Sequence, residues 1–254
     1  MSKGTVRQIV NGLVILATIA MNILANALPL NGQFTGDISD RFQVFFVPAG
    51  YVFSIWGLIY IGLLAFAVYQ ALPAKREDAT LRRIGYLPAL SGVANVAWLF
   101  FWHYNLFGWT LIAMLALLAS LLAIYLRAGI GRTQVASGAE RWCVRIPFSV
   151  YLGWITVATI ANVTDVLSLT PWSGWGLAPE MWAVVLLAVA VLIALAMAVT
   201  RRDAAYILVL TWAFAGIGVK QAGTPLVANS GWVAAAATAL LAVWALWSAR
   251  RASV

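Results

Sequence analysis

The chain alternates long apolar runs with short polar or basic segments. Runs of about 20 apolar residues are long enough to cross a bilayer as helices, and eight are predicted at residues 9–28, 48–72, 84–102, 109–125, 146–167, 181–199, 204–219 and 232–247. The third and seventh runs are the weakest, because they are short or polar. The polar stretch 29–47 is a long connection without an expected helix, and connections of this length are usually functional or disordered.

The run 146–167 carries polar and aromatic residues at depths where lipid disfavours them. On a helix that turns about 100° per residue, one stripe about 80° wide holds Tyr151, Trp154, Ala158, Asn162 and Asp165. Such a stripe is expected to face a protein interior or a ligand. The run 84–102 has a similar narrow face, formed by Ser91, Asn95, Trp98 and Trp102.

Composition and charge support an all-α, polytopic membrane protein. Of 254 residues, 63% are hydrophobic and only 9% are charged, whereas soluble domains carry about 25% charged residues. With a cytoplasmic N-terminus, the predicted spans place all Lys and Arg residues except Arg41 and Lys220 on the cytoplasmic side. This asymmetry favours eight spans with both termini cytoplasmic, in a membrane of the bacterial cytoplasmic type.

Several chemistries are disfavoured by what the chain contains. The net charge of +8 lies in short loops between spans, so it indicates membrane orientation and no nucleic-acid partner. Cys143 is the only cysteine, which excludes an internal disulfide. His103 is the only histidine and is expected at the surface of a short turn. No catalytic residues and no metal ligands are predicted.

Three segments, in this order, resemble the TspO/MBR family of tryptophan-rich sensory proteins. They are the sequence PAGYVFSIWGLIY at 48–60, the pattern Asn95-Val-Ala-Trp98 followed by two phenylalanines, and the stripe of run 146–167 with Thr159 beside it. The resemblance covers about residues 1–168. It implies a five-helix core at 1–168, so residues 169–254 are predicted to be a three-helix membrane extension.

The chain departs from the family pattern at the start of its second span. Pro48 is followed by Ala49 where the family has a second proline, and Tyr51 stands at the usual tryptophan. In the fifth span, Val150 replaces the proline that usually precedes Tyr151. These differences concern the identity of a ligand more than the fold of the core.

The resemblance implies a pocket between spans 2, 3 and 5, covered by the first loop, that binds tetrapyrroles such as porphyrin or haem. Aromatic side chains suit the flat apolar disc, and amides suit its carboxylate rim. The candidate ligand-binding residues are Tyr51, Phe53, Trp56, Asn95, Trp98, Tyr151, Trp154, Ala158 and Asn162. No obligatory cofactor is expected, since porphyrin or haem would be a ligand.

Other interpretations stay open. The chain is read first as a receptor or sensor for an apolar ligand, and alternatively as a secondary transporter or exporter, a light-dependent porphyrin-degrading protein or a partner subunit without ligand. Asn95 and Asn162 are equally well explained as interhelical hydrogen-bond partners. Asp165 is expected at a solvated helix end, with a pairing to Arg41 as a hypothesis. Small residues repeat every fourth position in the sixth and eighth spans, which favours packing within the chain over a homodimer.

Overall fold

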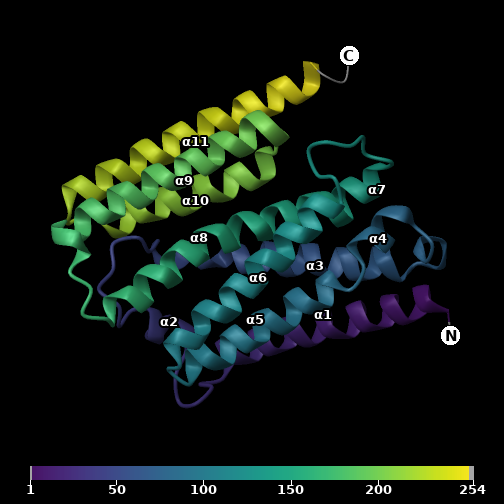
Figure 1. The fold of residues 1–254 in the computed structure, drawn as a ribbon, viewed down its shortest axis with the longest axis horizontal. Helices are drawn as coiled ribbons and strands as arrows, with labels where there is room; N and C mark the ends of the chain where they lie inside the picture. The colour runs from purple at the N-terminus through teal and green to yellow at the C-terminus, as the bar shows by residue number, and fades with distance from the viewer. Residues whose placement is uncertain (1, 252–254) are drawn as a thin grey trace. The chain divides into compact units, whose positions relative to one another are not determined.

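The computed structural model describes residues 2–251 and is built from helices (Figure 1). Within these residues the helical elements are α1 (Lys3–Ala27), α2 (Thr35–Ser39), η1 (Gly50–Ser54), α3 (Ile55–Ala71), η2 (Pro73–Lys75), α4 (Ala79–Ile84), α5 (Leu87–His103), α6 (Phe107–Arg127), α7 (Gly138–Glu140), η3 (Arg141–Arg145), α8 (Ile146–Ser168), η4 (Gly174–Gly176), α9 (Pro179–Arg201), α10 (Ala204–Lys220) and α11 (Pro225–Arg251). The expected all-α architecture is confirmed.

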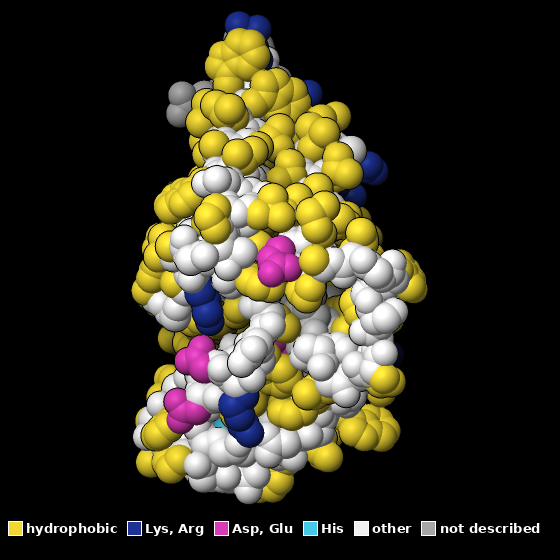
Figure 2. Space-filling model, turned by 90° about the vertical axis from the view of Figure 1, so that its left-hand side faces the viewer, with side chains coloured by type: hydrophobic (Ala, Val, Ile, Leu, Met, Phe, Trp, Pro, Cys, Tyr) yellow, Lys and Arg dark blue, Asp and Glu magenta, His cyan; other side chains and the backbone are white. Residues whose placement is uncertain are grey.

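Six helical stretches are long and apolar enough to cross a membrane. They contain α1, α3, α6, α8, α9 and α11, while α10 is a shorter apolar helix. Hydrophobic side chains cover much of the face in Figure 2, and large ones such as Leu13, Ile61 and Leu240 are exposed, as contact with lipid requires. The two runs expected to be weakest became α5 and α10, each of 17 residues. The count of eight spans stays a prediction.

The chain forms two compact units. Unit 1 contains the chain up to Arg41 together with Trp56–Ile155, and unit 2 contains Phe42–Ile55 together with the chain from Thr156 onward. Helix α8 runs through the boundary without a break. The expected division at residue 168 stays a prediction. The segment before α3 and the second half of α8 belong to the same compact unit as the last three helices.

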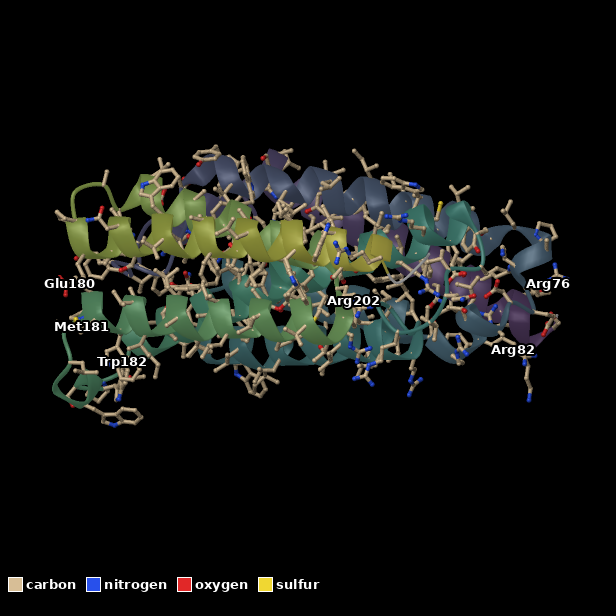
Figure 3. The ribbon with its side chains drawn as sticks, turned by 90° about the horizontal axis from the view of Figure 1, so that it is seen from above. Arg76, Arg82, Glu180, Met181, Trp182 and Arg202 are labelled. Atoms are coloured by element: carbon tan, nitrogen blue, oxygen red, sulfur yellow. The ribbon has the colours of Figure 1, made fainter. Side chains whose placement is uncertain are left out.

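Polar contacts hold the helices of unit 1 together. Gln8 Nε2 donates to the carbonyl of Gln70 at 2.6 Å, and Gln70 Nε2 donates to the carbonyl of Gln8 at 2.8 Å. Arg7 donates to the carbonyl of Arg76 at 2.8 Å, which joins the start of α1 to the segment after α3. Because basic segments far apart in sequence contact one another, the predicted cytoplasmic loops of unit 1 lie at one end, where Figure 3 labels Arg76 and Arg82.

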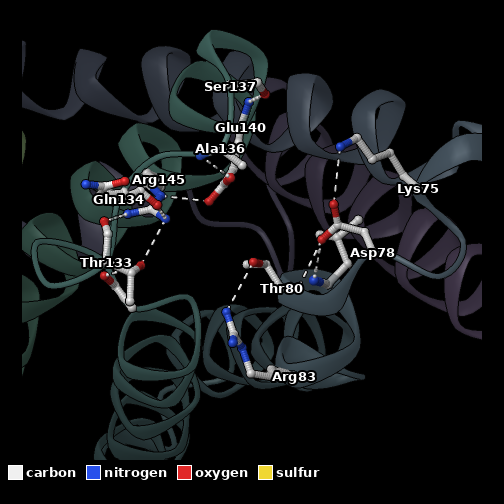
Figure 4. A network of polar contacts seen from close by, with 12 residues as sticks. Lys75, Asp78, Thr80, Arg83, Thr133, Gln134, Ala136, Ser137, Glu140 and Arg145 are labelled. Atoms are coloured by element: carbon white, nitrogen blue, oxygen red, sulfur yellow. Dashed lines mark hydrogen bonds and ion pairs between the residues drawn. The ribbon is translucent and has the colours of Figure 1, made fainter.

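A buried ion pair fixes the long connection between α6 and α8 (Figure 4). Arg145 Nε donates to Glu140 Oε1 at 2.8 Å, and both side chains are buried. The guanidinium also donates to the carbonyls of Thr133 and Gln134 at 2.7 and 2.9 Å. Glu140 Oε2 in turn accepts from the backbone N–H of Ala136 at 3.1 Å. Arg145 is therefore a structural cation, although the sequence indicates only a basic loop here.

In unit 2, helices α9, α10 and α11 pack through small residues. Ala190, Ala194 and Ala198 of α9 are fully buried, which confirms that this face packs within the chain. Gly231 of α11 meets the backbone of Gly218 in α10: a Cβ added at Gly231 would lie 2.8 Å from the nitrogen of Gly218. Figure 3 labels Trp182 near one end of α9 and Arg202 toward the other. The side chain of Arg250 lies outside the described residues.

Three expectations about loops and helix ends are wrong. The eighth span was predicted to begin at residue 232, but α11 already begins at Pro225, because proline fits the first helical position and Gly231 serves a close helix contact. The connection 29–47 contains the short helix α2. His103 is completely buried at the end of α5, because its ring nitrogens and its carbonyl all bond within the chain.

Candidate ligand site

Four aromatic side chains from α3 and α8 meet in unit 1. Trp56 stacks on Tyr60 with ring centroids 5.6 Å apart, and it meets Tyr151 and Trp154 edge-on at 5.9 and 6.3 Å. Tyr151 and Trp154 are each 2% exposed, whereas Trp56 is half-buried. The structure thus brings together three of the predicted ligand residues, of which Trp56 is the most exposed.

A ladder of amides connects this cluster to α5 and α1. Asn95 Nδ2 donates to the hydroxyl of Tyr151 at 3.0 Å. Asn22 Nδ2 of α1 donates to Asn95 Oδ1 at 2.7 Å and to the carbonyl of Thr18 at 2.9 Å. Asn95 is therefore an interhelical hydrogen-bond partner, which was one of its two interpretations, and it holds Tyr151 in place against Trp56.

Trp98 lies one helical turn after Asn95 on α5. Its ring stacks on Trp102 at 5.2 Å. The indole nitrogen of Trp98 is buried, yet no acceptor lies within hydrogen-bond distance of it among the described residues. A buried N–H donor without an acceptor costs free energy, so it needs an explanation such as a bound group. This is the one feature of the site that points beyond the protein itself.

The first loop is tied to the end of α5. Asn31 and Gln33 both donate to the carbonyl of His103, at 2.9 and 2.8 Å. His103 Nδ1 lies 2.8 Å from the carbonyl of Leu99, and Nε2 lies 3.2 Å from the hydroxyl of Thr35. A neutral ring with its proton on Nδ1 satisfies both contacts. In unit 1 the loop thus rests on the helix that carries Asn95 and Trp98.

The other four predicted ligand residues belong to unit 2. Tyr51 is half exposed and meets Trp212 of α10 edge-on at 5.4 Å. Phe53 is partly exposed, and Ala158 and Asn162 lie in the second half of α8, half-buried and buried respectively.

Asp165 is more buried than the sequence suggested, and its pairing with Arg41 stays a hypothesis. Asp165 is 8% exposed, so its expected position at a solvated helix end is wrong. Arg41 donates to Gln33 within the first loop. The stripe does face the interior, because Tyr151, Trp154, Asn162 and Asp165 are buried and Ala158 is half-buried.

Sequence reasoning missed two residues of this region. Asn22 was not assigned a role, although an asparagine inside an apolar run is a signal for an interhelical hydrogen bond. Trp212 was not considered either. Its signal was weaker, because a tryptophan within an apolar run usually faces lipid or the core.

Long apolar helices, outward-facing apolar side chains and a polar-aromatic interior define a helical-bundle integral membrane protein. The chain belongs to the TSPO-like protein family, whose family model matches residues 8–244. The predicted resemblance is thereby confirmed, and the match also covers α9, α10 and most of α11. No curated protein and no solved structure matches the chain.

Proposed function

We propose that the protein is a membrane receptor or sensor for a flat apolar ligand with oxygen acceptors at its rim, of the tetrapyrrole class. The observation that carries the proposal is the buried indole N–H of Trp98, for which the described residues offer no acceptor. A ligand carboxylate or carbonyl would satisfy this donor. The half-buried rings of Trp56 and Trp98 offer apolar surface to the disc of such a ligand.

The amide ladder supports this role because it fixes the site before a ligand arrives. Asn95 holds Tyr151 by a hydrogen bond, and Tyr151 packs edge-on against Trp56. Preorganised side chains reduce the entropy lost on binding. The interhelical role of Asn95 and a role in ligand binding are therefore compatible.

The test is a titration of the purified protein in nanodiscs with protoporphyrin IX, followed by the porphyrin absorbance band as well as by tryptophan fluorescence. Wild type is expected to saturate. Trp98→Phe keeps an aromatic ring but removes the N–H, so its Kd should rise by about 2- to 12-fold, the equivalent of one hydrogen bond. Asn95→Ala and Trp154→Ala should weaken binding as well.

Trp244→Phe is the matched control, because Trp244 lies on α11 in unit 2 and is exposed. A wild type without saturable binding would contradict the proposal, as would equal Kd values for Trp98→Phe and Trp244→Phe. Uptake of the porphyrin into liposomes would indicate an exporter. Loss of porphyrin under illumination would indicate degradation.

A further inference from the structure

The segment immediately before α3 is unusual because it packs as part of unit 2. We name residues 45–53 the lead-in segment. It runs through η1 directly into α3, and Trp56 follows in the first turn of that helix. Within unit 2 the lead-in segment contacts α10 at several successive points. These contacts give the C-terminal helices a role that their sequence alone does not reveal.

The closest contact joins the two backbones at Gly216. The N–H of Ala49 donates to the carbonyl of Gly216 at 3.1 Å. A Cβ at position 216 would lie 2.2 Å from Val52 Cγ2 and 3.0 Å from Pro48 Cβ. Val52 is completely buried and its β-branched side chain is stiff, so it has no room to move aside. Only glycine at position 216 permits this approach.

Trp212 lies one turn before Gly216 and holds the next part of the segment. Its Nε1 donates to the carbonyl of Val52 at 3.1 Å. That carbonyl also accepts from the N–H of Ile55, in the turn that leads into α3. The indole ring meets Tyr51 edge-on, with ring centroids 5.4 Å apart. One side chain of α10 thus contacts a predicted ligand residue and supports the start of the helix that bears another.

Two further contacts involve the start of the lead-in segment. Together with those of Gly216 and Trp212, they form a continuous row of contacts that we name the seam. Gln221 Nε2 donates to the carbonyl of Phe45 at 3.1 Å. Phe46, which is 1% exposed, meets Phe214 edge-on at 6.5 Å. The seam therefore combines backbone, amide, indole and phenyl contacts. They come from the second half of α10 and from its C-cap residue Gln221. A polar backbone segment inside a membrane protein needs such partners for its hydrogen-bonding groups.

We infer that α10 positions the lead-in segment and that Trp212 is a positioning residue for Tyr51, one of the predicted ligand residues, because its ring packs against Tyr51 and its N–H holds the carbonyl of Val52. The three C-terminal helices are in this respect a built-in support for the start of the second span. The effect on ligand binding rests on the function proposed above. The support of the lead-in segment by α10 does not depend on that function.

The experiment uses the full-length protein in nanodiscs and two matched pairs of variants. Trp212→Phe removes the indole N–H and keeps a ring, and Trp244→Phe is its control, since both tryptophans are 40% exposed. Gly216→Ala forces the seam apart, and Gly223→Ala is its control, since a Cβ there meets nothing within 4 Å. Hydrogen–deuterium exchange of residues 45–53 and the Kd for protoporphyrin IX are measured for each.

Trp212→Phe and Gly216→Ala should accelerate exchange of the lead-in segment by about 5-fold or more, since each disrupts at least one hydrogen bond or contact. Both should weaken porphyrin binding by about 2- to 10-fold, and the controls should match wild type. Unchanged exchange overturns the assignment of α10 as the support. Faster exchange with unchanged Kd overturns the role of Trp212 in the ligand site. If wild type binds no porphyrin, the proposed function fails. The hydrogen–deuterium exchange of residues 45–53 would still test whether α10 supports the lead-in segment.

Discussion

The two units differ in the contacts that hold their membrane helices together. Unit 1 uses side-chain hydrogen bonds, as in the ladder from Asn22 through Asn95 to Tyr151 and in the pair Arg145–Glu140. Unit 2 also has such bonds, for example from Trp212 to Val52, but its helices α10 and α11 approach closely through small residues, as at Gly218 and Gly231. Both strategies are known for membrane helices. Because polar contacts demand one particular arrangement, the ladder of unit 1 is suited to hold a specific site.

The largest expected effect comes from breaking the buried ion pair of unit 1. Arg145→Ala leaves the carboxylate of Glu140 buried without its cation, which should cost about 3–5 kcal/mol of unfolding free energy. Equilibrium unfolding of the protein in mixed micelles measures this loss. Arg82→Ala is the control, because the pair of Arg82 with Glu77 is well exposed and should contribute no more than about 1 kcal/mol. Equal losses in the two variants would contradict the distinction.

A smaller effect is expected from crowding the glycine contact of unit 2. Gly231→Ala places its Cβ against backbone atoms of Gly218 and Phe214 at 2.8–3.2 Å, and backbone atoms cannot rotate away. Overpacking of this kind costs about 1–3 kcal/mol, measured by the same unfolding assay. Gly223→Ala should match wild type. If Gly231→Ala were as stable as Gly223→Ala, small-residue packing would not be what stabilises unit 2.

The smallest effect concerns the N-cap of α4 in unit 1. Asp78 accepts from the N–H groups of Thr80 and Leu81 and pairs with Lys75 at 3.2 Å (Figure 4). Partial burial acts to raise the pKa of the Asp78 carboxyl, but the N–H of Leu81 and the Lys75 ammonium outweigh it, so the pKa is lowered. The stabilisation is therefore complete above the unfolded-state pKa of about 3.9 and is lost as pH falls through the lower folded-state pKa.

Asp78→Asn separates the cap from the charge, because asparagine caps helices about as well as aspartate. Exchange of the α4 amides should speed up below about pH 4 in wild type, in excess of the intrinsic pH dependence. The variant should show no such excess. If both proteins had the same pH profile, the protonation of Asp78 would not control the stability of α4.

The helices and part of the site could be predicted because their signals are local. The run 204–219 matches α10 closely, since Asp203 caps its start and a basic pair precedes it. The stripe on α8 correctly indicated an interior face, and Asn95 and Tyr151 do meet. The position of Tyr51 could not be predicted, because its partner Trp212 is distant in sequence and no local pattern encodes the pairing.

His103 and Gly231 were misread for a related reason. A histidine after an apolar run is usually exposed, but here the first loop folds back and buries it through Asn31, Gln33 and Thr35. A glycine between two apolar runs often marks a turn, but Gly231 permits a close helix contact. In both cases a contact between separate elements overrides the local preference of the residue.

The bond between Trp212 and Val52 also bears on how the protein is made. It joins residues 160 positions apart. At about 5–20 residues per second of synthesis, the lead-in segment waits roughly 10–30 s after its own emergence before α10 exists. During that interval Val52 and Phe46 lack the surface that buries them in the finished protein. Assembly at the membrane therefore has to protect this stretch, and a chain that stops before α10 would never cover it.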